Sequence, residues 1–474
     1  MSSTSSHEDT PMRAELTVRN VAQRVEGPLL FLKRTVTVGL NDAVQVIGQD
    51  GVVRLGRVAT LDEDSIIVEV LESTAGLGVR DTVVSMLGEP VSFDLGPNLL
   101  GRVFDSVGRP LDGQAPIPAM RRIRIDGMTI NPARRALPRD FIETGITAID
   151  LMNCLVRGQK LPLFSGSGLP HDRLATEIAQ RARLRDDPAG DFAVVFVGIG
   201  ISHDVAEAFR SAMETSGALG HTVMFLNRAD ESSAQRLLTP RYALTAAEYL
   251  AFEEGRHVLV IMTDMTNYCE ALREVSASHG EIPGRKGFPG YMYSDLATLF
   301  ERAGCLHGKP GTLTQLPILT LPGDDIGHPI PDLTGYITEG QIVLDRDLDR
   351  RRIYPPINVL PSLSRLMAYG TGEGFTHADH PALASQLFAA YANSRRVRVL
   401  ASVMGQEGLS DIDRNYLDFG DRFEEQLISQ PGARTLNESM AIAWEILAVL
   451  PDSELTRLSN EQIETCVRRK SSHA

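Results

Sequence analysis

The segment at residues 163–172, which reads LFSGSGLPHD, resembles a phosphate-binding loop but lacks the residues that bind phosphate and magnesium. A working loop reads G-x-x-x-x-G-K-[ST], because backbone amides surround the phosphates, the lysine neutralises them and the hydroxyl binds magnesium. Here Pro170, His171 and Asp172 occupy the positions of the second glycine, the lysine and the hydroxyl residue. Proline has no amide to donate, and an aspartate repels phosphate. The segment predicts a strand, loop and helix of a nucleotide-binding fold that has lost its catalytic groups.

A second trace of such a fold follows the apolar strand predicted at residues 258–262. Thr263 and Asp264 come directly after this strand, as in the element whose aspartate orders magnesium and water near phosphates. A strand that ends in aspartate also occurs at an ordinary helix-capping turn, so both interpretations of Asp264 stay open. The candidate nucleotide-binding residues, in a site expected to be weak or absent, are Gly166, Gly168, His171, Asp172 and Asp264.

Length and composition exclude several other classes of protein. A chain of 474 residues is long enough for about three domains. Its 47 basic and 61 acidic residues give a net charge of −14, which argues against a nucleic-acid-binding surface as the main function. The four cysteines lie far apart without a C-x-x-C pair, so we expect free thiols and no metal site. No run approaches the ~18 apolar residues of a membrane span, which predicts a soluble intracellular protein.

The N-terminal third divides into a tail, a barrel and a connection. Residues 1–12 are polar, and we expect them to form a disordered tail. Over residues 13–86, short predicted strands separated by turn signals are typical of a small β-barrel. These strands are expected at residues 43–47, 52–58 and 65–71. The segment at residues 87–113 is rich in glycine and proline and is interpreted most simply as a linker.

The rest of the chain predicts a RecA-like P-loop domain and a helical bundle, so the fold class is multidomain α/β. Over residues 87–371, apolar strands alternate with helical stretches, as in a parallel sheet covered by helices on both faces. These strands are expected at residues 193–197, 222–226, 258–262 and 316–321. Over residues 372–474 the pattern is helical only. Helices are expected at residues 383–403, 411–428 and 436–450, the last with a capping box of Thr435 and Glu438.

The most specific motif is PPINVLPSLSR at residues 355–365. It fits in full the P-[SAP]-[LIV]-[DNH]-x-x-x-S-x-S signature of the alpha and beta families of rotary ATPases, and Arg365 follows it directly. Segments at residues 101–110, 143–150, 290–297 and 332–340 fit the same family. The chain resembles, over nearly its whole length, the B subunit or beta chain of V-type and archaeal-type ATPases and ATP synthases.

This resemblance implies a non-catalytic, regulatory subunit of a larger complex. In this family the B subunit alternates with the catalytic A subunit in a six-membered ring, together with central rotor stalk and peripheral stalk subunits. The complex couples ATP synthesis or hydrolysis to proton or sodium transport across a membrane. The B subunit would be peripheral, on the cytoplasmic side, and in contact with the membrane sector only indirectly. The resemblance implies no tightly bound cofactor, but ATP or ADP with Mg at the interface with A, and no nucleic acid.

The resemblance also assigns roles to single positions. Arg365 would be an arginine finger that reaches the phosphates held by the A subunit, since a guanidinium has a fixed charge and forked donors. The alternative for Arg365 is a structural salt bridge. The glutamate that positions water in catalytic relatives is replaced by Ile199, which we place just after the strand. Asp204 and Glu207 are expected at the start of the next helix, where acidic groups complement the dipole.

Three competing classes depend on features that the sequence lacks or leaves open. A self-sufficient hexameric ATPase or export motor would need the loop lysine and the glutamate, and an RNA-handling motor would need a basic face. A plain scaffold differs from the favoured function only in the role of Arg365. The basic loop at residues 283–287 either faces the rotor, as similar loops do in this family, or is solvated. The charges at residues 324–325 and 345–352 are expected on exposed faces or subunit contacts.

Overall fold

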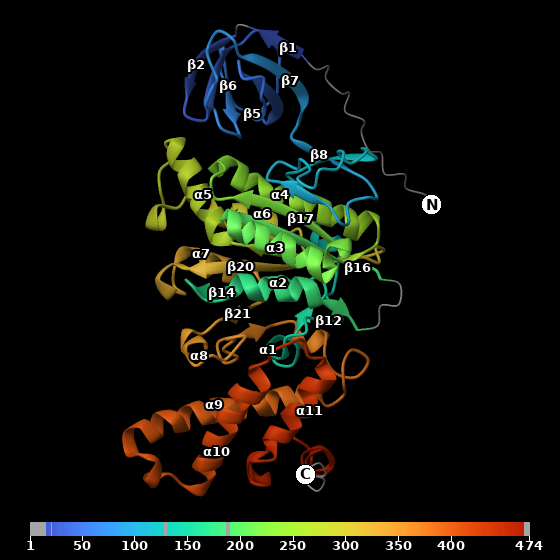
Figure 1. Cartoon of the computed structure of the whole chain (residues 1–474), viewed down its shortest axis with the longest axis vertical. Coiled ribbons are helices and arrows are strands. Elements are labelled where there is room, and N and C mark those ends of the chain that lie inside the picture. Colours follow the sequence, from blue (N-terminus) through green and yellow to red (C-terminus); the bar gives the residue numbers. More distant parts are fainter. Residues whose placement is uncertain (1–15, 20, 128–129, 186–189, 469–474) are drawn as a thin grey trace.

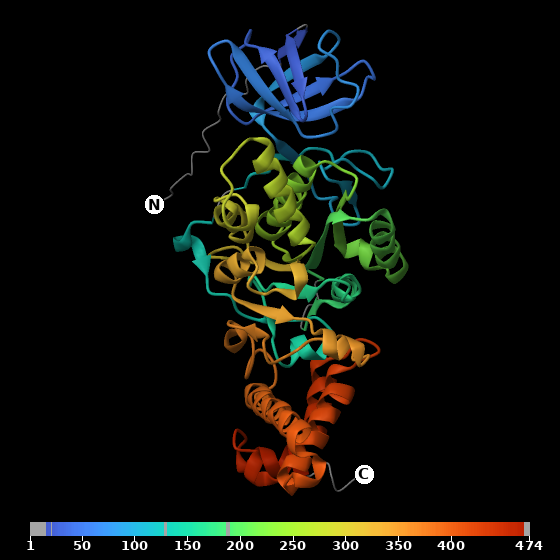
Figure 2. The same cartoon turned by 90° about the vertical axis from the view of Figure 1, so that its left-hand side faces the viewer.

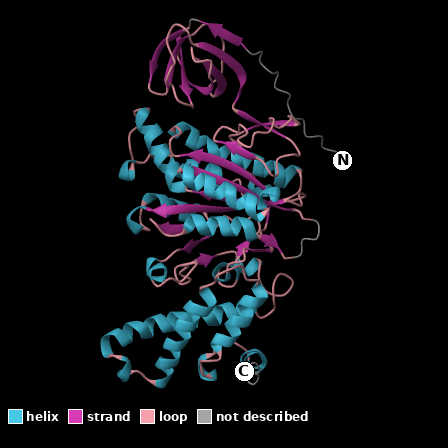
Figure 3. Ribbon diagram, in the orientation of Figure 1, coloured by secondary structure: helices cyan, strands magenta, loops and turns pink. Residues whose placement is uncertain are grey.

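The computed structural model describes residues 16–19, 21–127, 130–185 and 190–468, so the predicted disordered tail lies outside the described residues. The molecule is elongated, with a β-sheet domain at one end, a layered α/β part in the middle and helices at the other end (Figure 1). The turned view keeps the same order (Figure 2). Colouring by secondary structure separates the all-strand end from the all-helix end (Figure 3). This arrangement agrees with the predicted fold class.

The N-terminal part is a curved, seven-stranded antiparallel sheet with the order β1-β7-β4-β5-β6-β3-β2. Its strands are β1 (Leu16–Arg19), β2 (Ala22–Glu26), β3 (Leu29–Lys33), β4 (Asp42–Ile47), β5 (Val53–Leu61), β6 (Ser65–Val70) and β7 (Val83–Pro90). Alternate residues of β3 and β5 point inward, and Leu30, Val44 and Val58 are fully buried in one apolar core. The three strands predicted here correspond to β4, β5 and β6.

The central sheet has the strand order β22-β21-β14-β20-β18-β16-β17-β9, and its neighbours are parallel from β21 to β9. Its strands are β9 (Val103–Asp105), β14 (Leu163–Gly166), β16 (Phe192–Ile201), β17 (Thr222–Arg228), β18 (His257–Thr263), β20 (Thr312–Leu321), β21 (Gly340–Val343) and β22 (Leu363–Ser364). The four strands predicted from apolar runs correspond to β16, β17, β18 and β20.

Helices cover both faces of this sheet. Phe196 of β16 belongs to the apolar cluster under α2 (His171–Arg181) and α3 (His203–Ser216). Its neighbour Val195 belongs to the cluster under α4 (Ser233–Glu248), α5 (Met265–Ser278) and α6 (Met292–Phe300). Because successive strand residues point to opposite faces, burial on both sides explains the nearly continuous apolar runs.

Shorter elements complete the central part. The helices are α1 (Thr147–Asp150), α7 (Pro329–Ile337) and α8 (Arg346–Arg350). The small ladders are β8 (Ser92–Leu95) with β10 (Arg121–Arg124), β11 (Arg135–Ala136) with β19 (Gly304–Leu306), and β12 (Phe141–Glu143) with β13 (Leu155–Val156) and β15 (Arg183–Leu184). The cysteines are free thiols, as predicted: Cys154 and Cys269 are buried, and Cys305 and Cys466 are half-buried.

The segment at residues 87–113 is not the simple linker predicted from its glycines and prolines. It contains β8 and β9, and β9 pairs in parallel with β17 at the edge of the central sheet. Phe104 of β9 is fully buried and lies 5.1 Å from the Phe225 ring and 5.6 Å from the Phe93 ring, centroid to centroid. The prediction was wrong because the glycines and prolines mark the turns around strands that are only three and four residues long.

The C-terminal part is helical, as predicted. Its elements are α9 (His380–Met404), α10 (Asp411–Arg422) with a π-helical continuation (Phe423–Ile428), α11 (Leu436–Leu447) and α12 (Asn460–Gln462) with a second π-helical turn (Ile463–Arg468). The capping box of Thr435 and Glu438 is confirmed at the start of α11. Within the described ranges, none of the helices combines the length and the apolar character that a bilayer crossing requires.

The place of Phe104 in the core leads to a stability prediction. Phe104→Ala removes a fully buried ring, so we expect it to destabilise the protein by about 3–5 kcal/mol. Leu111→Ala in the same segment is the control, because Leu111 is 48% exposed and its truncation is expected to cost less than about 0.5 kcal/mol. Urea unfolding followed by circular dichroism compares the two variants. Equal midpoints would mean that the segment is a linker after all.

Candidate functional site

The altered phosphate loop has the predicted strand, loop and helix. Strand β14 ends at Gly166, and α2 begins at His171 without a side-chain cap at Pro170. Gly168 has a φ of +79°, a left-handed conformation that favours glycine, and the Leu169 amide donates to the Gly166 carbonyl at 3.1 Å. The loop therefore keeps a tight turn at the carboxyl end of a parallel strand, where ligands bind in folds of this kind.

The two altered side chains at the start of α2 bond within the protein. The Nδ1 atom of His171 lies 2.9 Å from the Leu169 carbonyl and 3.1 Å from the Ser165 hydroxyl oxygen. Because a carbonyl only accepts, Nδ1 carries the proton that it donates to this loop. Asp172 Oδ1 accepts from the Thr263 hydroxyl at 3.4 Å and lies 3.7 Å from the His171 Nε2. His171, the first residue of α2, thus bonds back to the loop, and Asp172 places a carboxylate beside it.

Asp264 has the helix-capping arrangement. Its Oδ1 accepts from the Thr266 amide at 2.8 Å, which caps α5, and from the Thr320 amide at 3.2 Å. The side chain is buried, and this burial raises the pKa of Asp264. The Oδ1 atom of Asp264 therefore already accepts hydrogen bonds from two backbone amides.

An ion pair that the sequence did not predict covers the altered loop. Arg346 at the start of α8 donates from Nε to Oδ2 and from Nη2 to Oδ1 of Asp324, both at 2.9 Å. The same Nη2 donates to the Ser167 carbonyl at 2.9 Å. The hydrogen bond from Arg346, supported by the Ser167 amide, lowers the pKa of Asp324. We expected these charges on exposed faces or subunit contacts; Asp324 is exposed and Arg346 partly so, but no local pattern predicts an ion pair between residues that are 22 positions apart.

The position of the missing glutamate is filled by apolar core. Ile199 is fully buried, and its carbonyl accepts from the Asn267 side chain at 2.9 Å. The residue lies within β16 rather than after it, because this strand continues to Ile201. Asp204 lies in the first turn of α3, as predicted, and Glu207 one turn later pairs with Arg210.

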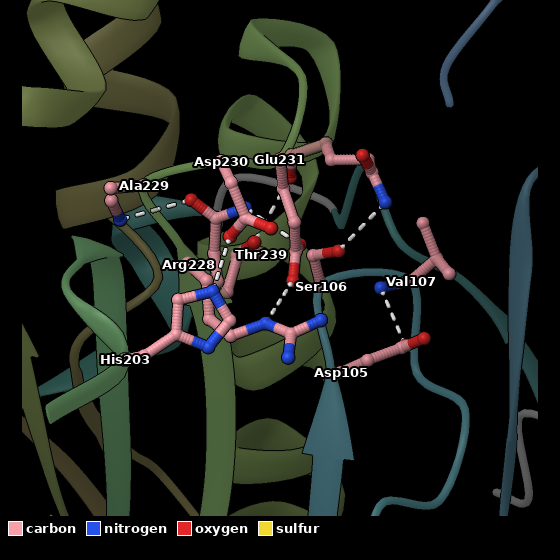
Figure 4. Close-up of polar contacts among 12 residues, drawn as sticks. Asp105, Ser106, Val107, His203, Arg228, Ala229, Asp230, Glu231 and Thr239 are labelled. Carbon is pink, nitrogen blue, oxygen red and sulfur yellow. Dashed lines mark hydrogen bonds and ion pairs between the residues drawn. The ribbon is translucent and has the colours of Figure 1, made fainter. Parts of the chain in front are cut away.

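A polar cluster follows β17 and β9 at the same edge of the sheet, but its charges are paired with one another (Figure 4). His203 Nε2 donates to Asp230 Oδ1 at 3.0 Å, and Arg228 lies 3.2 Å from Glu231. Asp105 accepts two backbone amides of the turn that follows it, and burial raises the pKa of Asp105. In the described parts of the chain, no three histidine, cysteine or acidic side chains converge to hold a metal ion.

The polar residues of the motif at residues 355–365 hold its loop in place. Asn358 donates to Asp345 at 2.7 Å, and the Ser362 hydroxyl accepts from the Val343 amide at 3.0 Å. The buried Ser364 hydroxyl donates to the Cys154 carbonyl at 2.7 Å. The spacing of the motif therefore corresponds to three side chains that fasten the chain between the end of β21 and β22.

Arg365 is exposed at the end of this fastened loop. Its amide donates to the Glu339 carbonyl at 3.0 Å. The buried Gln159 side chain donates to the same carbonyl at 3.1 Å and to the Ser364 hydroxyl at 3.0 Å. Among the residues that the structure describes, no carboxylate lies within 4.0 Å of the Arg365 guanidinium, in contrast to the ion-paired arginines around the altered loop. Its backbone is fixed while its charge is uncompensated.

Arg365 lies at the amino ends of the parallel strands, whereas the altered loop lies at their carboxyl ends. Strand β21 runs parallel to β14, whereas β22 is antiparallel to β21 with Ser364 opposite Gly340. The register places Arg365 beside residue 160, about six residues before Gly166, which corresponds to roughly 20 Å along the strand. Arg365 therefore lies far from the altered loop of its own chain. It lines a groove of about 320 Å³ with the exposed apolar side chains of Leu363 and Phe388.

Known protein families match the chain in three consecutive parts. The beta-barrel domain of the ATP synthase alpha/beta family matches residues 22–88, and the nucleotide-binding domain of this family matches residues 145–364. The C-terminal domain of V and A type ATP synthase matches residues 369–467. The predicted barrel, nucleotide-binding fold and C-terminal helical part are confirmed.

Two relatives cover nearly the whole chain. The V-type ATP synthase beta chain of Halothermothrix orenii is 53% identical over 452 residues, which cover 95% of this chain and 97% of the relative. An A-type ATP synthase B subunit of Methanospirillum hungatei is 50% identical over 450 residues, which cover 94% and 97%. The chain belongs to the family of V-type and A-type ATP synthase B subunits. This finding confirms the resemblance inferred from the motif at residues 355–365.

A solved structure supports the same assignment for the fold of this B-family chain. The ATP synthase subunit NeqB of Nanoarcheaum equitans has a TM-score of 0.70 and 34% identity, and the match covers 91% of this chain and 99% of that one. Within the B-family chain, the structure brings together Gly166, Gly168, His171, Asp172 and Asp264 and places Arg365 elsewhere. Sequence reasoning missed Gln159 and the pair of Asp324 and Arg346.

The fastening of the motif loop predicts a cost for Ser364→Ala. This change removes the hydroxyl that donates to the Cys154 carbonyl and one of the two acceptors of the Gln159 amide, so we expect a loss of about 1–3 kcal/mol in stability. Ser402→Ala is the matched control, because its exposed hydroxyl bonds only to the Val399 carbonyl of its own helix. Thermal unfolding compares both variants with the parent, and an unchanged midpoint for Ser364→Ala would show that the loop does not depend on this hydroxyl.

Proposed function

We propose that this chain is the non-catalytic, regulatory B subunit of a V-type or A-type rotary ATP synthase. In this proposal it alternates with a catalytic A subunit in a six-membered ring, with central rotor stalk and peripheral stalk subunits as further partners. The complex couples ATP synthesis or hydrolysis to proton or sodium transport across a membrane. The chain itself is peripheral, on the cytoplasmic side. Its proposed domains are residues 13–86, 87–371 and 372–474.

The altered loop supports a non-catalytic role. Pro170 brings no amide donor, His171 is bonded within the loop and Asp172 adds a negative charge beside it. Phosphoryl transfer depends on positioned cations and on a group that orients water. Ile199 offers no such group, since its side chain is apolar and buried. We therefore infer no tightly bound nucleotide in this loop, and ATP or ADP with Mg at the interface with the catalytic subunit.

The observation that carries the proposal is the position of Arg365. The side chain is exposed, has no ion-pair partner among the described residues and lies at the amino ends of the parallel strands, opposite the altered loop. A guanidinium placed in this way is available to phosphates of a neighbouring chain and out of reach of its own loop. The exposed Leu363 and Phe388 beside it suit a protein interface. We propose Arg365 as an arginine finger that acts in trans.

Precise placement of this arginine is supplied by buried groups. Gln159 bonds to the carbonyl that receives the Arg365 amide and to the hydroxyl of the preceding residue, Ser364. Lys160 pairs with the Glu339 carboxylate at 2.9 Å and fixes the other side of the same turn. Because an arginine finger stabilises charge only where it is positioned beforehand, this support favours a chemical role over that of a plain scaffold.

The first prediction of this proposal concerns the isolated chain. We expect highly purified full-length protein to hydrolyse no Mg-ATP above background, because the loop lacks its lysine and hydroxyl and Ile199 positions no water. Phosphate release is the measurement, and Asp264→Ala is the control for contamination. Steady release that disappears in Asp264→Ala would contradict the proposal.

The second prediction concerns Arg365 in the assembled complex. Arg365→Ala should leave the ring assembled but lower the turnover of ATP by about 10³–10⁵-fold, or roughly 4–7 kcal/mol of barrier. Arg365→Lys should rescue little, because a point charge cannot reproduce forked contacts. Arg350→Ala is the matched control, since Arg350 is an exposed arginine whose ion pair, within the described ranges, is with Asp347 on its own helix. If assembled Arg365→Ala complexes turn over ATP at a rate within a few fold of the parent's, Arg365 has no chemical role and the chain is a plain scaffold.

A further inference from the structure

Strand β14 lies between β20 and β21, so the segments after all three strands meet at one edge (Figure 1). The altered loop follows β14, Asp324 follows β20, and Arg346 begins the helix after β21. The parallel register aligns Gly166 with Leu321, three residues before Asp324. Three segments that are distant in sequence thus place an aspartate and an arginine directly on the loop.

The contact between Asp324 and Gly166 leaves no free space. A Cβ atom at Gly166 would lie 2.4 Å from Asp324 Oδ1 and 2.8 Å from Arg346 Nη2. Gly166 has no positive φ, so its backbone does not require glycine. A side chain at residue 166 would therefore require the Asp324 carboxylate and the Arg346 guanidinium to move.

A carboxylate in this position is a chemical substitute for phosphate. Both anions accept forked hydrogen bonds from arginine, and both are bound by amides of a loop between strand and helix. Arg346 gives two hydrogen bonds to Asp324 and a third to the Ser167 carbonyl, so its donors point at the loop. The side chains of Arg346 and Asp324 are 36% and 48% exposed, so an anion from solvent can reach the pair without unfolding.

We propose that Asp324 is a built-in anion that keeps the altered loop closed to oligophosphates. In this proposal Arg346 is the cation that would bind a phosphate at the loop if Asp324 were absent. The loop has thus lost its catalytic groups, and the protein's own carboxylate also occupies the place where a phosphate would bind. An oligophosphate would have to displace the Asp324 carboxylate and approach Asp172 as well, and both repel it. The proposal does not depend on any role of Arg365.

The chain contains a matched control at the next residue. Asp325 carries the same charge, is also exposed, and pairs with Lys286 at 3.2 Å and with the Gly327 amide at 2.9 Å. It has no contact with the loop among those described. Asp324→Ala and Asp325→Ala therefore change the net charge equally, but only the first should open the loop.

The test is calorimetric titration of the isolated full-length chain with inorganic triphosphate at low salt. We expect the parent and Asp325→Ala to bind weakly or not at all. Asp324→Ala should bind at least about tenfold more tightly than either, because it frees the Arg346 guanidinium. Adding Arg346→Ala to Asp324→Ala should remove this gain. Asp324→Asn, which keeps the size of the side chain, is the second variant in case the alanine does not fold.

Each outcome decides the proposal. Binding by Asp324→Ala that equals the parent's, with both folded by circular dichroism, would overturn the built-in anion. An equal gain in Asp325→Ala would also overturn it, because the effect would then be one of overall charge. Retained binding in the double variant would overturn the assignment of Arg346. Tighter triphosphate binding that is found only in the Asp324 variants, and that disappears when Arg346→Ala is added, supports the roles proposed for both Asp324 and Arg346.

Discussion

The parallel pairing of β14 with β20 on one side and β21 on the other determines where every group of interest lies. Parallel strands have their carboxyl ends on the same side of the sheet. The loop at Gly166, Asp324 and Arg346 therefore meet in space although they are far apart in the sequence. The antiparallel pairing of β22 with β21 brings Arg365 back to the amino ends of the parallel strands. A single B-family chain thus presents a loop with an ion pair on it at the carboxyl ends of the strands, and at the other ends an arginine without an ion-pair partner among the described residues.

Much of this fold could be predicted, because its signals are local. Continuous apolar runs identified β16, β17, β18 and β20, and Thr435 with Glu438 identified the start of α11. The apolar runs could not say which residue faces which layer, since both faces are buried. Strand β9 was missed because three residues among glycines and prolines carry no pattern of their own. Its stability comes from pairing with β17, which lies far downstream in the sequence.

The sequence offered candidate site residues where a motif names them, and offered none where the contacts depend on packing. The motif at residues 355–365 pointed to Arg365, but not to the buried Gln159, whose partners lie 180 and 205 positions away. Asp264 fits two interpretations in sequence; the Thr266 amide shows the cap of α5, whereas the bond from the Thr320 amide on another strand could not be predicted. Asp324 and Arg346 look like ordinary surface charges, because composition carries no information about which charges meet.

The pairing of β9 with β17 affects how the molecule bears a load. The chain that leaves the N-terminal domain passes through β8 and is then hydrogen-bonded into the edge of the central sheet at β9. A force that pulls the two domains apart along β9 would act on its hydrogen bonds in shear, so that they resist together rather than opening one after another. The Phe104 ring, in contact with Phe93 and Phe225, adds an anchor at this point. The connection from the N-terminal domain is therefore part of the central sheet at β9 and is not a free linker.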